Sequence, residues 1–222
     1  MRILYHTWLC PFSRRIRLQL MEKKLDFSME WERIWDKRPQ FLNMNPAGLT
    51  PVLVDLGGAV VVESYAIGEY LEECYQDRPL LGTTPTEKGE VRRLIHWFEN
   101  KFYHEATHNL VFQKFFKTKY GLGGPDPRCI RDGQGSLGNH LEYIGWLTDH
   151  RRWLAGEHLT LADFAAAAQL SCIDYLGDVR WEKFPTAKDW YVRVKSRPSF
   201  RSLLQERIPG IAPAPHYHDL DF

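Results

Sequence analysis

Cysteine is scarce in this sequence, which has four cysteines among 222 residues. They stand at positions 10, 74, 129 and 172, and their spacing matches neither a zinc knuckle nor a disulfide framework. A chain of this length can bury a hydrophobic core without covalent cross-links. We therefore expect no structural disulfide and no structural metal, as is usual in a reducing compartment.

Excess charge and long hydrophobic runs are also missing. Lysine and arginine together number 29, aspartate and glutamate 28, and the formal net charge of +1 creates no global field that attracts nucleic acid. The longest apolar stretch, residues 159–173, contains Asp163 and Gln169 and is shorter than the roughly 18 apolar residues of a membrane span. His6 and Thr7 interrupt the apolar N-terminus, which argues against a secretory signal. We expect a cytoplasmic protein without a membrane span.

The sequence divides into four parts that differ in composition. Residues 1–78 alternate short apolar runs with amphipathic ones, which predicts a small mixed sheet covered by helices. Residues 79–87 are rich in proline and threonine and predict a linker. Residues 88–205 keep helical spacing of apolar side chains and predict an all-helical domain. Residues 206–222 contain three prolines without a period and predict an extended tail.

Residues 11–24 predict the first helix, because their apolar side chains recur at every fourth position. The arginines at positions 14, 15 and 17 fall between these apolar positions, and we expect them to face solvent.

A lone thiol stands directly before this helix, in the stretch CPFSRR. Pro11 in the first turn places Cys10 at the helix mouth, where free N–H groups and the helix dipole favour a thiolate. Ser13 can hydrogen-bond the sulfur but cannot resolve a mixed disulfide, so the pattern fits conjugation or deglutathionylation better than dithiol exchange. The alternative is that Cys10 is a small buried hydrophobe, and spacing alone does not decide between the two.

Four motifs resemble those of the cytosolic glutathione transferases, and they occur in that family's order: CPFSRR, NMNPAGLTPVL, VESYAIGEYLE and LAGEHLTLADFAAAA. The resemblance runs from about residue 2 to residue 204. It implies a thioredoxin-like α/β domain followed by an all-α domain.

The same resemblance implies a glutathione site. Cys10 or Ser13 would face the glutathione sulfur, and Thr50, before a cis Pro51, would pair its backbone with the cysteinyl part. Glu63 and Ser64 would hold the γ-glutamyl end, where a serine and helix N–H groups form an anion site. The site needs no further cofactor, and glutathione would be its substrate or a vestigial ligand.

Thr160 and Asp163 have the spacing of a capping box, and we expect them to begin a helix and not to act in catalysis. The segment His104–His108 matches the zinc motif H-E-x-x-H, but no third ligand follows, so we expect no metal. The segment Gly133–Gly138 matches G-x-G-x-x-G, but it follows a helical pattern and not a strand. Its glycines weaken a helix by about 1 kcal/mol each.

The segment that contains DYLGDV and the tail PAPHYHDLDF support a narrower resemblance. They resemble the transferase-like proteins of alphaproteobacteria that bind the division protein FtsZ. This implies a homodimer that binds FtsZ filaments and changes their curvature at the division site during cytokinesis. The predicted partner contacts are Trp35, Arg38, Tyr217, Asp219, Leu220, Asp221 and Phe222.

Residue chemistry supports these contacts. Tryptophan and arginine are frequent interface hot spots, and acids that alternate with apolar side chains resemble a peptide ligand. The tail could instead be a loose end or a strap over its own subunit. We expect a binding protein more than an enzyme, and the alternative is a glutathione-dependent transferase or deglutathionylase that uses Cys10.

Overall fold

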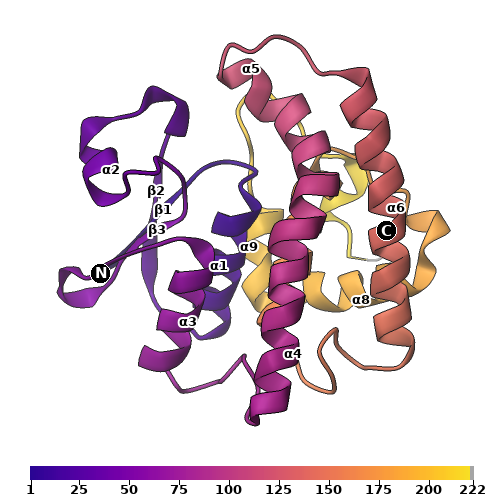
Figure 1. Ribbon diagram of the computed structural model, residues 1–222, viewed down its shortest axis with the longest axis horizontal. Helices are drawn as coiled ribbons and strands as arrows, with labels where there is room; N and C mark the ends of the chain where they lie inside the picture. Colours follow the sequence, from indigo (N-terminus) through magenta and orange to yellow (C-terminus); the bar gives the residue numbers. More distant parts are fainter. Residues whose placement is uncertain (221–222) are drawn as a thin grey trace.

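The computed structural model describes residues 1–220 and contains a sheet unit beside a helical unit (Figure 1). The strands are β1 (Arg2–His6), β2 (Phe27–Trp31), β3 (Val52–Val54) and β4 (Val60–Val62). Their order in the sheet is β2-β1-β3-β4; β1 and β2 are parallel, and the other two pairs are antiparallel. This sheet confirms the predicted thioredoxin-like α/β unit.

Helices α1 (Pro11–Glu22) and α3 (Ser64–Cys74) lie on the face of the sheet that looks toward the helical unit. The short α2 (Pro39–Met44) lies on the opposite side (Figure 1). Apolar side chains of β1, α1, β3 and α3 form the small core between them. The connections hold the 3-10 helices η1 (Ile34–Asp36) and η2 (Leu56–Gly58).

The second unit is helical, as predicted. Its segments are α4 (Pro85–His96), the π-helical η3 (Trp97–Phe116), α5 (Lys117–Lys119), α6 (Pro127–Asp149), α7 (Leu161–Tyr175), η4 (Trp181–Lys183), α8 (Pro185–Lys195), η5 (Pro198–Phe200), α9 (Arg201–Leu204) and η6 (Pro215–His218). Every residue of α7 is buried, and this helix packs against α1, α4 and η3. The predicted capping box at the start of α7 is present, with Asp163 also accepting a hydrogen bond from the Trp190 indole at 3.0 Å.

Helix α4 begins inside the stretch that we predicted as the linker, residues 79–87. Thr84 and Glu87 form a capping box around its first turn. Leu80 and Leu81 are buried in the core of the helical unit. The last part of the predicted linker is therefore ordered as helix.

One glycine of the G-x-G-x-x-G segment has a packing reason. A Cβ atom at Gly133 would lie 2.8 Å from the Asn109 Cβ, so glycine permits the close approach of α6 to η3. Gly135 and Gly138 meet no such obstacle, and nothing in the structure explains them.

The prediction that three arginines of α1 face solvent is wrong. Arg14, Arg15 and Arg17 are each at most 5% exposed. Helix α1 lies between the sheet and the helical unit, so the face opposite its apolar stripe is covered by α7, α3 and the C-terminal segment. A helix that is buried on two faces lacks the solvent side on which that prediction depended.

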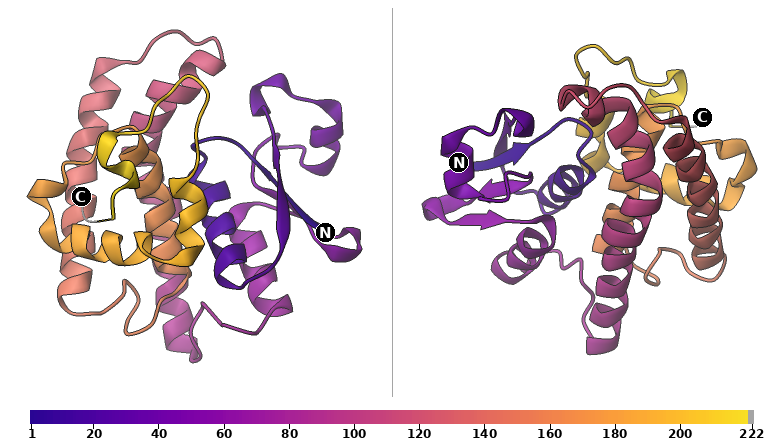
Figure 2. Two further views of the ribbon diagram at one scale, coloured as in Figure 1. Left: turned by 180° about the vertical axis from the view of Figure 1, so that it is seen from behind. Right: turned by 45° about the horizontal axis from the view of Figure 1, so that its top comes forward.

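The predicted extended tail folds back onto its own helical unit (Figure 2). Glu206 is 7% exposed, and Tyr217 in η6 is fully buried. The Tyr217 ring packs edge-on against Tyr175 of α7 at 5.0 Å between ring centroids. Up to residue 220, this segment is a strap over its own chain, which is one of the alternatives that the sequence left open.

Candidate functional site

The Cys10 thiol is buried at the mouth of α1. Cys10 is 8% exposed, and its Sγ donates a hydrogen bond to the Thr50 carbonyl oxygen at 3.5 Å. Burial raises the pKa of Cys10, and hydrogen bonding from Ser13 and Thr50 opposes this rise without cancelling it. Of the two alternatives that the sequence left open, burial and the raised pKa favour the small buried thiol over a thiolate.

The peptide bond between Thr50 and Pro51 is cis, as predicted. This bond brings Thr50 against Cys10, so the two parts of the predicted cradle meet although they lie forty residues apart. The Thr50 hydroxyl donates to the Thr7 hydroxyl at 3.1 Å. Ser13 is buried in the first turn of α1, at 2% exposed.

The predicted γ-glutamyl end lies at the start of α3. Glu63 precedes the helix with φ = 70° and is exposed, while Ser64 is buried. The Ser64 hydroxyl donates to the Glu99 carboxylate at 3.0 Å. Arg15 pairs with the same carboxylate at 2.6 Å and also donates to the Ser64 carbonyl oxygen. The Ser64 hydroxyl, which would hold the carboxylate of a ligand, already donates to the carboxylate of Glu99.

Sequence reasoning missed Glu99 because nothing in its local pattern marks it. Glu99 lies in η3 of the helical unit, whereas Ser64 and Arg15 belong to the sheet unit. Only the packing of the two units brings the three side chains together.

Two cavities meet beside this site. One of about 420 Å³ is lined by Glu63 and Ser64, and the other, of about 350 Å³, is lined by Cys10. Phe12, Leu49, Thr50 and Tyr103 line both of them. The cradle therefore opens on one side to polar groups and on the other to apolar ones.

Tyr103 stands at the boundary of the two cavities. Its ring packs on Phe12 at 4.8 Å between centroids. Burial raises the pKa of Tyr103 to about 12, so its hydroxyl stays protonated at neutral pH.

The H-E-x-x-H segment contributes aromatic packing. His108 stacks on Phe112 at 4.6 Å with an interplanar angle of 14°. Burial and the neighbouring His104 lower the pKa of His108. Among residues 1–220, no group of three His, Cys, Asp or Glu side chains is placed to hold a metal ion.

The predicted partner contacts lie in different environments. Trp35 is half-buried and faces Tyr120 edge-on at 6.4 Å, and Arg38 pairs with the buried Glu32. Asp219 and Leu220 are exposed. Tyr217 is buried within its own chain, so it cannot contact a partner without leaving that position. The predictions for residues 221 and 222 lie outside the described part of the chain.

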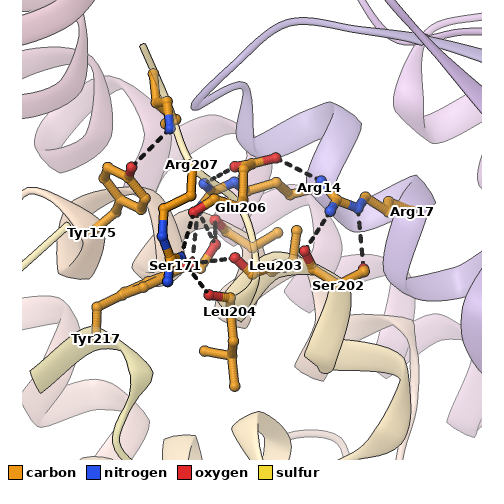
Figure 3. Close-up of polar contacts among 12 residues, drawn as sticks. Arg14, Arg17, Ser171, Tyr175, Ser202, Leu203, Leu204, Glu206, Arg207 and Tyr217 are labelled. Atoms are coloured by element: carbon orange, nitrogen blue, oxygen red, sulfur yellow. Dashed lines mark hydrogen bonds and ion pairs between the residues drawn. The ribbon is translucent and has the colours of Figure 1, made fainter. Parts of the chain in front are cut away.

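A charged network that the sequence did not reveal lies one turn into α1 (Figure 3). Glu206 of the tail accepts from Arg14 at 2.5 Å and from Arg17 at 2.7 Å. Arg14 also donates to the hydroxyls of Ser171 and Tyr217, at 2.9 and 3.4 Å. Burial alone would raise the pKa of Glu206, but the two arginines hold it below its ordinary value. The network joins the sheet unit, α7 and the strap.

Comparisons with known proteins agree with this architecture. Models of the glutathione S-transferase N-terminal and C-terminal domains match residues 9–74 and 138–198. The FtsZ-localized protein A of Caulobacter vibrioides is 48% identical over 100% of this chain and 98% of its own length. No helix within residues 1–220 has the length and apolar character to cross a membrane.

Solved structures extend the similarity to three dimensions. A glutathione S-transferase from Rhodospirillum rubrum F11 is 51% identical with a TM-score of 0.98 and covers 100% of both chains. FzlA from C. crescentus is 48% identical with a TM-score of 0.97 and covers 100% of this chain and 99% of its own. Fold, domain models and full-length similarity together show that the chain belongs to the glutathione S-transferase superfamily.

Proposed function

We propose that this protein binds FtsZ filaments and alters their curvature at the division site, and that its transferase fold serves as a scaffold. The full-length similarity to an FtsZ-localized protein supports this function, because it includes the C-terminal segment. The observation that carries the proposal is the buried Cys10 thiol with its raised pKa. A neutral thiol that is removed from solvent is a poor nucleophile, which speaks against catalysis by Cys10 and for a scaffold role.

A homodimeric state and a set of surface residues would suit a filament partner. A homodimer would present two equal faces to a repeating polymer and would gain avidity from it. We assign the contact to Trp35 and Arg38 on the sheet unit and to Asp219 and Leu220 on the strap, with Asp221 and Phe222 beyond them. Tyr217 then has the separate task of anchoring the strap.

Co-sedimentation with purified FtsZ and GTP tests the proposal. We expect the protein to pellet with the polymer and electron microscopy to show filaments that are more curved. A chain that ends at His218 keeps the buried Tyr217 and loses residues 219–222, so it should fold and bind more weakly. Wild-type protein that stays in the supernatant at every salt concentration contradicts the function.

The second candidate is a glutathione-dependent transferase or deglutathionylase. The cradle of Cys10, Thr50 and Pro51 and the cavity beside Ser64 support it, as does the similarity to the Rhodospirillum rubrum transferase. Calorimetric titration with glutathione tests it. A dissociation constant below about 1 mM, or about 4 kcal/mol of binding free energy, favours this candidate, particularly if Cys10→Ala abolishes turnover.

A further inference from the structure

The cavity beside Cys10 has walls from both units. Ile34 and Leu49 come from the sheet unit, whereas Val111, Phe112 and Phe116 come from η3. Its volume of about 350 Å³ is at the small end of the range for ligand pockets. That space suits a large apolar side chain or two smaller ones.

The mouth of this cavity exposes apolar side chains that the described chain does not cover. Leu49 is 50% exposed, Leu122 is 60% exposed, and Tyr120 is 36% exposed. Leu122 follows the end of α5 in the helical unit, whereas Leu49 belongs to the sheet unit, and both line the cavity. Apolar side chains that are exposed together around a cavity are typical of a protein-binding surface.

Two exposed lysines are close in sequence to lining residues of the cavity. Lys37 follows η1 three residues after the lining residue Ile34, and Lys119 directly precedes the lining residue Tyr120. Both lysines are exposed, and within residues 1–220 neither forms an ion pair. The nearby carboxylate of Asp36 is already paired with Arg33 at 3.0 Å. The surroundings of the cavity therefore favour an acidic partner.

The chemistry inside the cavity is limited to contact. The Cys10 thiol is protonated and turned to the Thr50 carbonyl, and the Tyr103 hydroxyl also keeps its proton. Neither group offers a charged anchor to a small electrophile. A partner would gain its affinity from apolar burial and from the lysines around the mouth.

We propose that this cavity is a socket for an apolar side chain carried by an acidic segment of the FtsZ subunit. This inference rests on the proposed function and names the surface through which the filament is held. Inserted apolar side chains that fill a pocket dominate the affinity of protein interfaces, and the surrounding charges set orientation and association rate.

Substitutions at the mouth test the socket in co-sedimentation with FtsZ. We expect Leu122→Asp and Leu49→Asp each to weaken binding by about tenfold or more, because they place a negative charge where an acidic segment docks. Leu56→Asp is the matched control, since Leu56 is a leucine of η2 at 54% exposure outside the cavity. The control should bind within about twofold of wild type.

The outcomes separate the two hypotheses. If wild-type protein does not bind FtsZ, the proposed function fails and the socket fails with it. If wild-type protein binds and both mouth variants bind equally well, the socket alone is wrong. Circular dichroism of each variant shows whether it has kept the fold.

A fluorescent probe provides a second readout. Anilinonaphthalene sulfonate, which is apolar and anionic, should bind the cavity with increased fluorescence. FtsZ polymer should release it over the same concentration range in which it binds the protein, and Leu122→Asp should reduce probe binding. Probe that stays bound while FtsZ pellets the protein would overturn the proposal.

Discussion

The start of helix α1 carries two buried sites that differ in charge, although both lie within residues 10–17. At its mouth, Cys10 is buried without a charged partner, and burial raises the thiol pKa. One turn later, Arg14 and Arg17 are equally buried, but Glu206 pairs with both. A buried ionisable group keeps its charge when an opposite charge comes with it, and otherwise takes its neutral form.

Removing the opposite charge is the strongest test of this comparison. Glu206→Gln should lower the free energy of unfolding by about 3–5 kcal/mol, because it leaves two buried guanidinium groups without their carboxylate. Urea denaturation followed by tryptophan fluorescence measures the change. Asp36→Asn is the control, since it breaks an exposed pair with Arg33, and it should change stability by about 0.5 kcal/mol or less. A Glu206 variant as stable as the control would contradict this account.

The pH dependence of stability tests the same rule at His6, which is also buried. Burial and then the neighbouring Arg17 lower the pKa of His6 from 6.5 to about 4. The unfolded chain therefore binds a proton between these values that the folded chain does not bind, so stability falls as the pH is lowered through 6.5 toward 4. Between pH 7 and pH 5 the loss should be about 2 kcal/mol.

The substitution His6→Gln should remove the share of this pH dependence that comes from His6, while His108 and His140, whose pKa values burial also lowers, keep theirs. Urea denaturation of both proteins at pH 7 and pH 5 measures it, in a range that lies above the ordinary pKa of the carboxylates. An equal slope in wild type and variant would show that His6 is not the group responsible.

The neutral form of Cys10 predicts low reactivity. Iodoacetamide at pH 7.5 should modify the exposed Cys74 about tenfold faster than the buried Cys10, because alkylation requires an accessible thiolate. Mass spectrometry of peptides taken over time gives both rates in one sample. Preferential modification of Cys10 would make the enzyme the leading candidate.

The smallest expected effect concerns Cys10 in partner binding. Cys10→Ser should leave co-sedimentation with FtsZ within about twofold of wild type, because the thiol supplies no charge to the contact. A large loss of binding in Cys10→Ser would show that the thiol has a direct role.

Much of the fold could be predicted from local patterns. Apolar periodicity located α1 and predicted the helical nature of the second unit, and short apolar runs predicted the small mixed sheet. The capping residues Thr160 and Asp163 were found because a capping box has fixed spacing and needs no distant partner. The meeting of Cys10 with Thr50 followed from family resemblance and not from periodicity.

The candidate site was less predictable, because its properties depend on groups far apart in the chain. Glu99 reaches Ser64 from the other unit, and Glu206 reaches Arg14 across 192 residues. No local pattern marks either carboxylate. The solvent-facing prediction for the α1 arginines failed for the same reason, since a helix pattern does not show what covers its second face.

The sequence by itself determined the order of the elements, the division into a sheet unit and a helical unit, and the place of a thiol at a helix mouth, because propensity, periodicity and capping act within a few residues. Only the tertiary structure decided which of these groups are charged. Burial and long-range pairing set the protonation states, so the thiol is neutral, the arginines are paired, and the tail is strapped to the body of its own chain.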